Sequence, residues 1–159
     1  MLRQSAILAA ALACCSCNVL GNSEQFAVRC SGTQSLIISA PDAPSISNQD
    51  ARTYVIDPDR KALYRADPYM VADLCALNGR CDLEVTPDRV TAIMTKTVGS
   101  GGNRSQTESR FVLDRTKGEL RTTEVMTVYI DNDPGSPITT EGTFTCATVP
   151  VPDFKVPEA

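Results

Sequence analysis

The stretch QTESRFVLDRTKGELRTTEVMTVYID, residues 106–131, decides the fold class of this chain of 159 residues. Two runs rich in β-branched and aromatic residues flank the polar segment Arg115-Thr116-Lys117-Gly118. Such runs favour β-strands, and a glycine at the end of a short polar segment provides the positive φ that hairpin turns often require. The stretch therefore predicts a long β-hairpin that turns at Gly118.

Two further turns with similar chemistry precede this hairpin. Pro58 follows Asp57, and Pro87 precedes Asp88, each between two short apolar runs. A proline at the second turn position fixes φ near the type I value, and an aspartate beside it can accept a backbone hydrogen bond. Regular turns between short strands predict an all-β domain, an antiparallel meander or a small barrel, with a sandwich as the alternative. We expect one β domain over residues 26–149, with about seven to nine strands.

One short helix and one early hairpin are also predicted. Asp67 suits the N-cap position and Pro68 the first helical position, while Asn78-Gly79 is typical of a helix end. Near the start of the domain, Ser31-Gly32-Thr33 separates two apolar runs, which predicts a turn. The domain is thus expected to begin with a hairpin and to carry its helix between residues 67 and 79.

The first segment, residues 1–17, has the features of an export signal. Arg3 precedes an apolar run too short to span a bilayer, and small residues lead into Cys14-Cys15-Ser16-Cys17. This order resembles the cleavage box of bacterial lipoproteins, in which a cysteine becomes the first mature residue and carries the lipid. The resemblance implies lipidation at Cys14, or at Cys15 in the alternative frame, and ordinary signal-peptide cleavage competes with both. Residues 18–25 are interpreted as a linker and residues 150–159 as a proline-rich tail.

Four of the seven cysteines lie in the predicted domain, namely Cys30, Cys75, Cys81 and Cys146. An even number of cysteines in an exported chain indicates disulfides, and four cysteines allow three connectivities. We favour Cys75 with Cys81, because they are close in the sequence, and Cys30 with Cys146, which would join the first strand to the last. A zinc site is the alternative, but the sequence has neither a Cys-x-x-Cys pair nor a histidine.

The composition argues against several functional classes. The formal charge of −4 and the pI of about 4.8 provide no basic field for phosphates, so nucleic acid is not an expected partner. The chain has no tryptophan and no histidine, the usual general base near neutral pH. Paired carboxylates such as Asp57 and Asp59 are one route to a hydrolase, but their place in a turn favours hydrogen bonding. We expect no catalytic residue, no metal site and no cofactor.

In outline, a lipoprotein-like leader followed by a small disulfide-linked β-barrel resembles small uncharacterised exported bacterial proteins and the bacterial inhibitors of C-type lysozyme. The Ser-Ala-Ser-Gly-type loop and the tryptophan-containing strands of those inhibitors are absent from this sequence, so the resemblance transfers no functional residue.

The sequence therefore predicts a non-enzymatic protein of the cell envelope that binds a protein or a surface component. We expect it to be exported, either to the periplasm or to an outer-membrane anchor, with membrane contact only through an N-terminal lipid. The alternatives are a lysozyme-inhibitor-like periplasmic protein and a carboxylate-based hydrolase.

Overall fold

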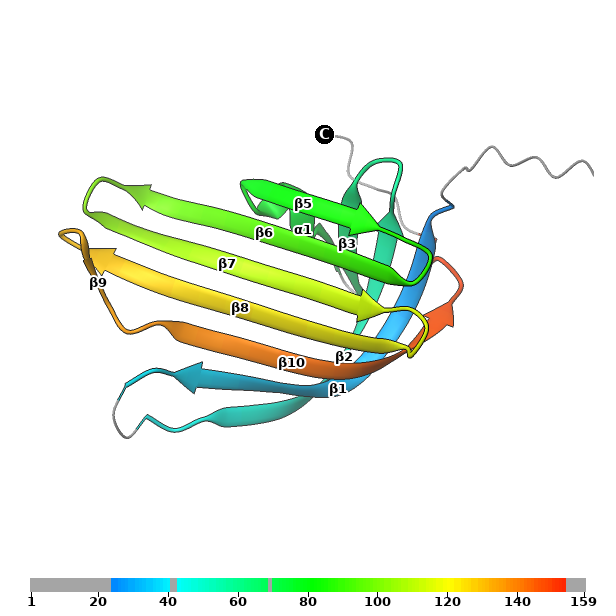
Figure 1. The fold of residues 1–159 in the computed structure, drawn as a ribbon, viewed down its shortest axis with the longest axis horizontal. Helices are drawn as coiled ribbons and strands as arrows, with labels where there is room; N and C mark the ends of the chain where they lie inside the picture. Colours follow the sequence, from blue (N-terminus) through cyan, green and yellow to red (C-terminus); the bar gives the residue numbers. More distant parts are fainter. Residues whose placement is uncertain (1–23, 41–42, 69, 154–159) are drawn as a thin grey trace, which may run out of the picture.

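The β-hairpin predicted over residues 106–131 lies within one curled antiparallel sheet (Figure 1). The computed structural model describes residues 24–40, 43–68 and 70–153. Strands β7 (Asn103–Asp114) and β8 (Glu119–Ile130) pair along nearly their whole length, and Gly118 in the turn between them has φ of 64°. The predicted hairpin and its positive-φ glycine are confirmed.

The sheet is formed by ten strands of the described residues, in the order β4-β3-β2-β1-β10-β8-β7-β6-β5, with β9 paired to β8. The other elements are β1 (Phe26–Ile38), β2 (Ile46–Asp57), β3 (Ala62–Asp67), β4 (Met70–Asp73), α1 (Leu74–Leu77), β5 (Arg80–Val85), β6 (Arg89–Ser100), β9 (Asp133–Pro134) and β10 (Ile138–Val149). The strands curl into a half-barrel (Figure 1), which confirms the all-β class with one short helix. A two-sheet sandwich is wrong, because every strand belongs to the same sheet.

The first strand continues through the segment where the sequence predicts a turn. β1 pairs with β10 and with β2 on both sides of Gly32, so the expected early hairpin is wrong. A Cβ atom at Gly32 would lie 2.1 Å from the carbonyl oxygen of Thr143 and 2.6 Å from the Cα of Phe144. Glycine inside a strand permits such a close backbone approach. The glycine signal therefore marks tight packing of β1 against β10, not a chain reversal.

The helix begins later than predicted. Asp67 is the last residue of β3 and pairs with Met70 of β4, so the chain reverses at the expected helix start. The N-cap of α1 is Asp73, whose Oδ1 accepts hydrogen bonds from the N–H groups of Cys75 and Ala76 at 2.9 and 3.1 Å. Pairing with β3 holds residues Met70–Asp73 in β4, ahead of the helix. The proline signal was ambiguous, because proline suits a turn as well as the first turn of a helix.

Both disulfide pairings favoured from the sequence are present. Cys30 and Cys146 face each other in register across β1 and β10, with Cα atoms 4.0 Å apart. Cys75 in α1 is joined to Cys81 in β5. Since β4 and β5 are the two edges of the sheet, the second disulfide lies in the short connection between those edges.

The hydrophobic core occupies the inner face of the half-barrel near one end of the strands. Its largest fully buried side chains are Phe144, Ile56, Leu63, Leu113, Leu120, Val55, Val90 and Cys30, of which all except Val55 belong to one cluster. Successive residues of a strand point to opposite faces, so inner-facing residues recur every second position. In β7 this inner row runs from Leu113 and Phe111, which are buried, to Ser109, which is half-buried. The inner face thus changes from apolar to polar along the strands.

Candidate functional site

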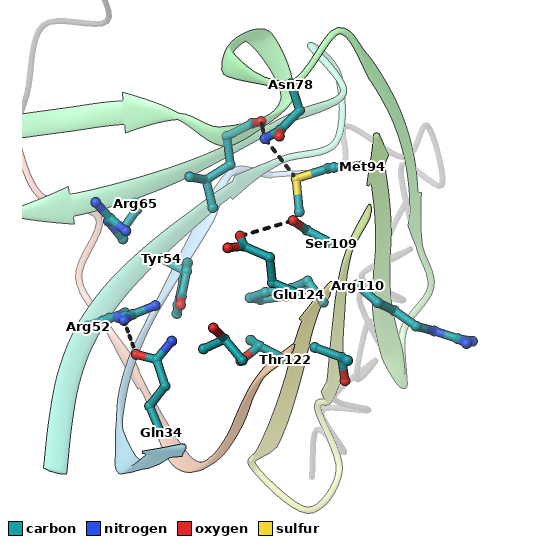
Figure 2. Close-up of a pocket in the computed structure, with 14 residues that line it drawn as sticks. Gln34, Arg52, Tyr54, Arg65, Asn78, Met94, Ser109, Arg110, Thr122 and Glu124 are labelled. Atoms are coloured by element: carbon teal, nitrogen blue, oxygen red, sulfur yellow. Dashed lines mark hydrogen bonds between the residues drawn. The ribbon is translucent and has the colours of Figure 1, made fainter. Parts of the chain in front are cut away.

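A pocket of about 120 Å³ lies where the inner face becomes polar (Figure 2). Tyr54 and Phe111 line its apolar side, and their rings meet edge to face with centroids 5.0 Å apart. Arg52 lies two residues before Tyr54 in β2, and Ser109 lies two residues before Phe111 in β7, so both share the face of the core. The pocket is a continuation of the core surface in which polar side chains replace apolar ones.

Arg52 is fixed in this pocket by neighbours on two strands. Its guanidinium forms an ion pair with Asp50 of the same strand and donates a hydrogen bond to Oε1 of Gln34 in β1. It also lies close enough to the phenol of Tyr54 to act on the pKa of that group. Three contacts therefore orient the Arg52 guanidinium.

Arg65 reaches the pocket from β3. Oδ2 of Asp67 lies 3.4 Å from its Nε, but the geometry of this ion pair does not make a hydrogen bond. Nε is buried, and among the described residues it has no hydrogen-bond partner. A buried donor of this kind is normally satisfied by a protein group, a water molecule or a ligand. Arg65 therefore lines the pocket with a guanidinium whose Nε is ion-paired with Asp67 but has no hydrogen bond among the described residues.

Glu124 of β8 approaches from the opposite side and points into the pocket toward Tyr54 (Figure 2). Oγ of Ser109 donates a hydrogen bond to Oε2 of Glu124 over 3.2 Å. Above these residues, Nδ2 of Asn78 donates to the carbonyl oxygen of Leu74 and lies 3.7 Å from the Met94 sulfur. Arg52 and Arg65, each ion-paired with an aspartate of its own strand, thus lie across the pocket from Glu124.

The phenol of Tyr54 is a neutral hydrogen-bonding group in this setting. Burial raises the pKa of Tyr54 above its ordinary value, and the positive charges of Arg52 and Arg65 oppose that rise without cancelling it. A tyrosine with a raised pKa keeps its proton throughout the neutral range. Tyr54 can therefore donate its hydroxyl proton to an acceptor in the pocket.

A second hollow of about 330 Å³ continues the pocket along the inner face. It is lined by Gln34, Leu36, Ile46, Asn48, Gln49, Asp50 and Thr140. Gln34 and Thr140 line both hollows, so the two are continuous across β1 and β10. We call this joint surface the trough. It runs from the edge of the core toward the ends of β1 and β2, where Ile46 is 50% exposed.

The carboxylates that the sequence singled out lie elsewhere. Asp57 is the last residue of β2 and Asp59 lies in the turn before β3, and neither lines the pocket. Asp57 is only 7% exposed, accepts a hydrogen bond from the backbone N–H of Arg60 at 3.0 Å, and has the Arg60 guanidinium 3.6 Å away. This is the turn-capping role that its position predicts. Cys14 and Cys15 lie outside the described residues.

Sequence reasoning did not identify the pocket residues. The signal was present in the alternation of β2, where Arg52-Thr53-Tyr54-Val55-Ile56 places an arginine on the same face as two aromatic or apolar residues. A charged residue that continues an inward-facing row indicates either a site or the end of a core. Only the sheet order, which brings β2 and β3 opposite β8, distinguishes these two cases.

Comparison with protein-family models, curated proteins and solved structures found no match. Within residues 24–40, 43–68 and 70–153, no group of three or more histidine, cysteine, aspartate or glutamate residues is arranged to hold a metal ion. The helix of this same part of the chain is too short to cross a membrane. The geometry of the trough is therefore the basis for a functional assignment.

Proposed function

We propose that the protein is an exported, non-enzymatic component of the cell envelope that binds a protein or a surface component in the trough. The observation that carries this proposal is the continuity of the two hollows through Gln34 and Thr140. Concave surfaces that combine apolar side chains with a few converging polar groups are the usual form of a binding site. The trough has both, with Leu36 and Ile46 toward one end and Arg52 at the other.

The two disulfides support an extracytoplasmic location. Disulfides persist mainly in oxidising compartments such as the bacterial periplasm. They agree with the export signal predicted for residues 1–17, and with a lipid at Cys14, or at Cys15 in the alternative frame. We therefore propose the periplasm or the outer membrane as the location, with the lipid as the membrane contact.

The charges of the trough support binding in preference to hydrolysis. Glycoside hydrolysis commonly requires two carboxylates that flank the scissile bond. Glu124 is the one carboxylate among the described residues that line the pocket, and Asp50, in the second hollow, is ion-paired with Arg52. This arrangement favours recognition of polar groups by fixed side chains.

A pair of adjacent substitutions tests the proposal. Thr140→Arg places a long cationic side chain in both hollows, whereas Thr139→Arg changes a neighbouring residue that lines neither. We expect solubilised envelope fractions to shift the amide NMR signals of Gln34 and Glu124 in the isotope-labelled, disulfide-bonded protein. Thr140→Arg should abolish these shifts, and Thr139→Arg should retain them.

Four outcomes would contradict the proposal. Equal responses of the two variants, or shifts restricted to the outer face, would remove the trough as the binding surface. Cleavage of an added component, seen as a change in its mass, would establish catalysis. An unprocessed chain that begins at Met1 and has four free domain thiols would exclude export. The intact mass with and without reduction measures the processing, the thiols and the lipid.

A further inference from the structure

We propose that the pocket end of the trough binds an α-amino carboxylate, a group that carries an ammonium and a carboxylate on the same carbon. The inference deepens the proposed function and rests on it, because it names the chemical class recognised at one end of the trough. Two sources carry this group, a free amino acid and the zwitterionic end of a cell-wall peptide. Arg52, Arg65 and Glu124 carry the argument.

The ligand carboxylate fits the side formed by β2 and β3. The Nε of Arg65 is buried beside Asp67, with which it forms an ion pair, and the Arg65 side chain as a whole is 32% exposed. A guanidinium has five N–H donors, so the terminal NH groups of Arg65 remain for the ligand. Arg52 is held in place by Asp50 and Gln34 and lines the same pocket. Hydrogen bonds between guanidinium and carboxylate are charge-assisted and stronger than neutral ones. This side therefore offers a preorganised set of donors.

The ligand ammonium fits the side formed by β7 and β8. Glu124 points into the pocket (Figure 2), and Ser109 orients its carboxylate through a hydrogen bond of 3.2 Å. No ion pair joins Glu124 to a cation in the part of the chain that the structure describes. An ionised carboxylate accepts hydrogen bonds at two oxygens, and Ser109 uses one of them. The other oxygen remains for an ammonium group.

The opposed charges select between ligand classes. A simple anion attracted by Arg65 would also lie near the negative charge of Glu124, and a simple cation near Glu124 would lie near two guanidinium groups. A zwitterion presents the favourable charge to each side, and such complementarity determines specificity. A volume of about 120 Å³ suits a compact group of a few heavy atoms. Charge and size thus favour an α-amino carboxylate.

The test is an NMR and calorimetric titration of the folded, disulfide-bonded protein with D-alanine and L-alanine. Propionate lacks the ammonium and ethylamine lacks the carboxylate, so they serve as matched half-ligands. We expect either alanine isomer to shift the signals of Tyr54 and Glu124 and to bind at least about tenfold more tightly than either half-ligand, since each charged hydrogen bond contributes about 1.5 to 3 kcal/mol. Propionate that binds as tightly as alanine would overturn the inference.

Three variants test whether Arg65 and Glu124 bind the two charged groups of the ligand. Arg65→Gln and Glu124→Gln should each weaken alanine binding at least about tenfold, because each removes one charged partner. Arg121→Gln is the control: Arg121 is exposed on the same strand as Glu124 and lines neither hollow of the trough, so alanine affinity should not change. Thermal unfolding verifies that all three variants are folded. Alanine affinity that is unchanged in Arg65→Gln and Glu124→Gln would contradict the assignment.

A titration with a cell-wall peptide distinguishes the two sources of the α-amino carboxylate. It also distinguishes a failure of this inference from a failure of the proposed function. A soluble cell-wall peptide with a free α-amino carboxylate that binds more tightly than alanine would identify the peptide source, and the reverse order would identify the free amino acid. Shifts in the trough with envelope fractions, but with neither alanine nor the peptide, would overturn this inference and leave the proposed function. Absence of shifts with every addition would overturn both.

Discussion

At the scale of single residues, Gly32 is the described glycine at which an added Cβ would approach another backbone atom most closely. Any Cβ there would overlap the backbone of β10, at 2.1 Å from the carbonyl oxygen of Thr143, and backbone atoms cannot move aside as the end of a side chain can. Gly79 offers a matched comparison, because a Cβ there would meet only the carbonyl oxygen of Thr95 at 3.8 Å, an ordinary contact. The two glycines therefore differ in the space around them.

We predict that Gly32→Ala lowers the free energy of unfolding by about 1 to 3 kcal/mol, the usual cost of overpacking. Gly79→Ala should change it by less than about 0.5 kcal/mol, as is usual for substitutions away from packed sites. Urea denaturation of the oxidised proteins measures both values. Equal stability of the two variants would show that β1 does not approach β10 as closely at this position.

At the scale of elements, the turn between β7 and β8 is organised by one carboxylate. Oδ1 of Asp114 accepts hydrogen bonds from the hydroxyl and N–H groups of Thr116 and from the N–H group of Lys117, at 2.7, 3.1 and 3.0 Å. These bonds, first the one from the Thr116 side chain, lower the pKa of Asp114 below its ordinary value of 3.8. The ionised form therefore favours the folded hairpin.

The pH dependence of this turn follows from the direction of that shift. A carboxyl group whose pKa is lower in the folded state stabilises the fold above its unfolded pKa and loses this effect as the pH falls through the folded pKa. We predict that Asp114→Ala is less stable than the unmodified protein near pH 7 and that this difference narrows below about pH 3.8. Denaturation at both pH values measures the difference. A constant difference would argue against ionised Asp114 as the cause.

Elements whose structure depends on neighbouring residues could be predicted from the sequence, whereas elements that depend on distant partners could not. The hairpin over residues 106–131 and the turns at Asp57-Pro58 and Pro87-Asp88 depend on local chemistry, which a single sequence contains. The turn after Asp67 joins the consecutive strands β3 and β4, and it was missed because a proline suits a turn as well as a helix start. The unbroken β1 depends on a partner far along the chain, because β10 supplies hydrogen bonds that override the local turn signal. The pocket belongs to this second class: Arg65 and Glu124 come from strands that only the curled sheet brings together.

At the scale of the whole molecule, the two disulfides close loops of very different length. Cys30 and Cys146 are 116 positions apart, and Cys75 and Cys81 are 6 positions apart. In the chain-entropy model these loops stabilise the fold by about 5 and about 2 kcal/mol. Cys30 is also fully buried, so its loss removes core packing as well.

We predict that Cys30→Ala with Cys146→Ala lowers the denaturation midpoint more than Cys75→Ala with Cys81→Ala. Each double variant removes one disulfide without leaving a free thiol in the domain, so each serves as the control for the other. Urea denaturation under non-reducing conditions measures the order. A larger loss in the variant that lacks Cys75 and Cys81 would indicate that the link between the sheet edges stabilises the fold more than the link between β1 and β10.

The pairing of Ala27 with Val149 places the start of β1 and the end of β10 side by side, at the end of the half-barrel that contains the core (Figure 1). Leu36, which lines the far part of the trough, is nine positions along β1, about 30 Å away at about 3.3 Å per residue. A lipid, an affinity handle or a surface linkage attached beyond either terminus would therefore hold the molecule by the end of the half-barrel that contains the core. The far part of the trough, near Leu36, then points away from the attachment and is accessible to a ligand in solution.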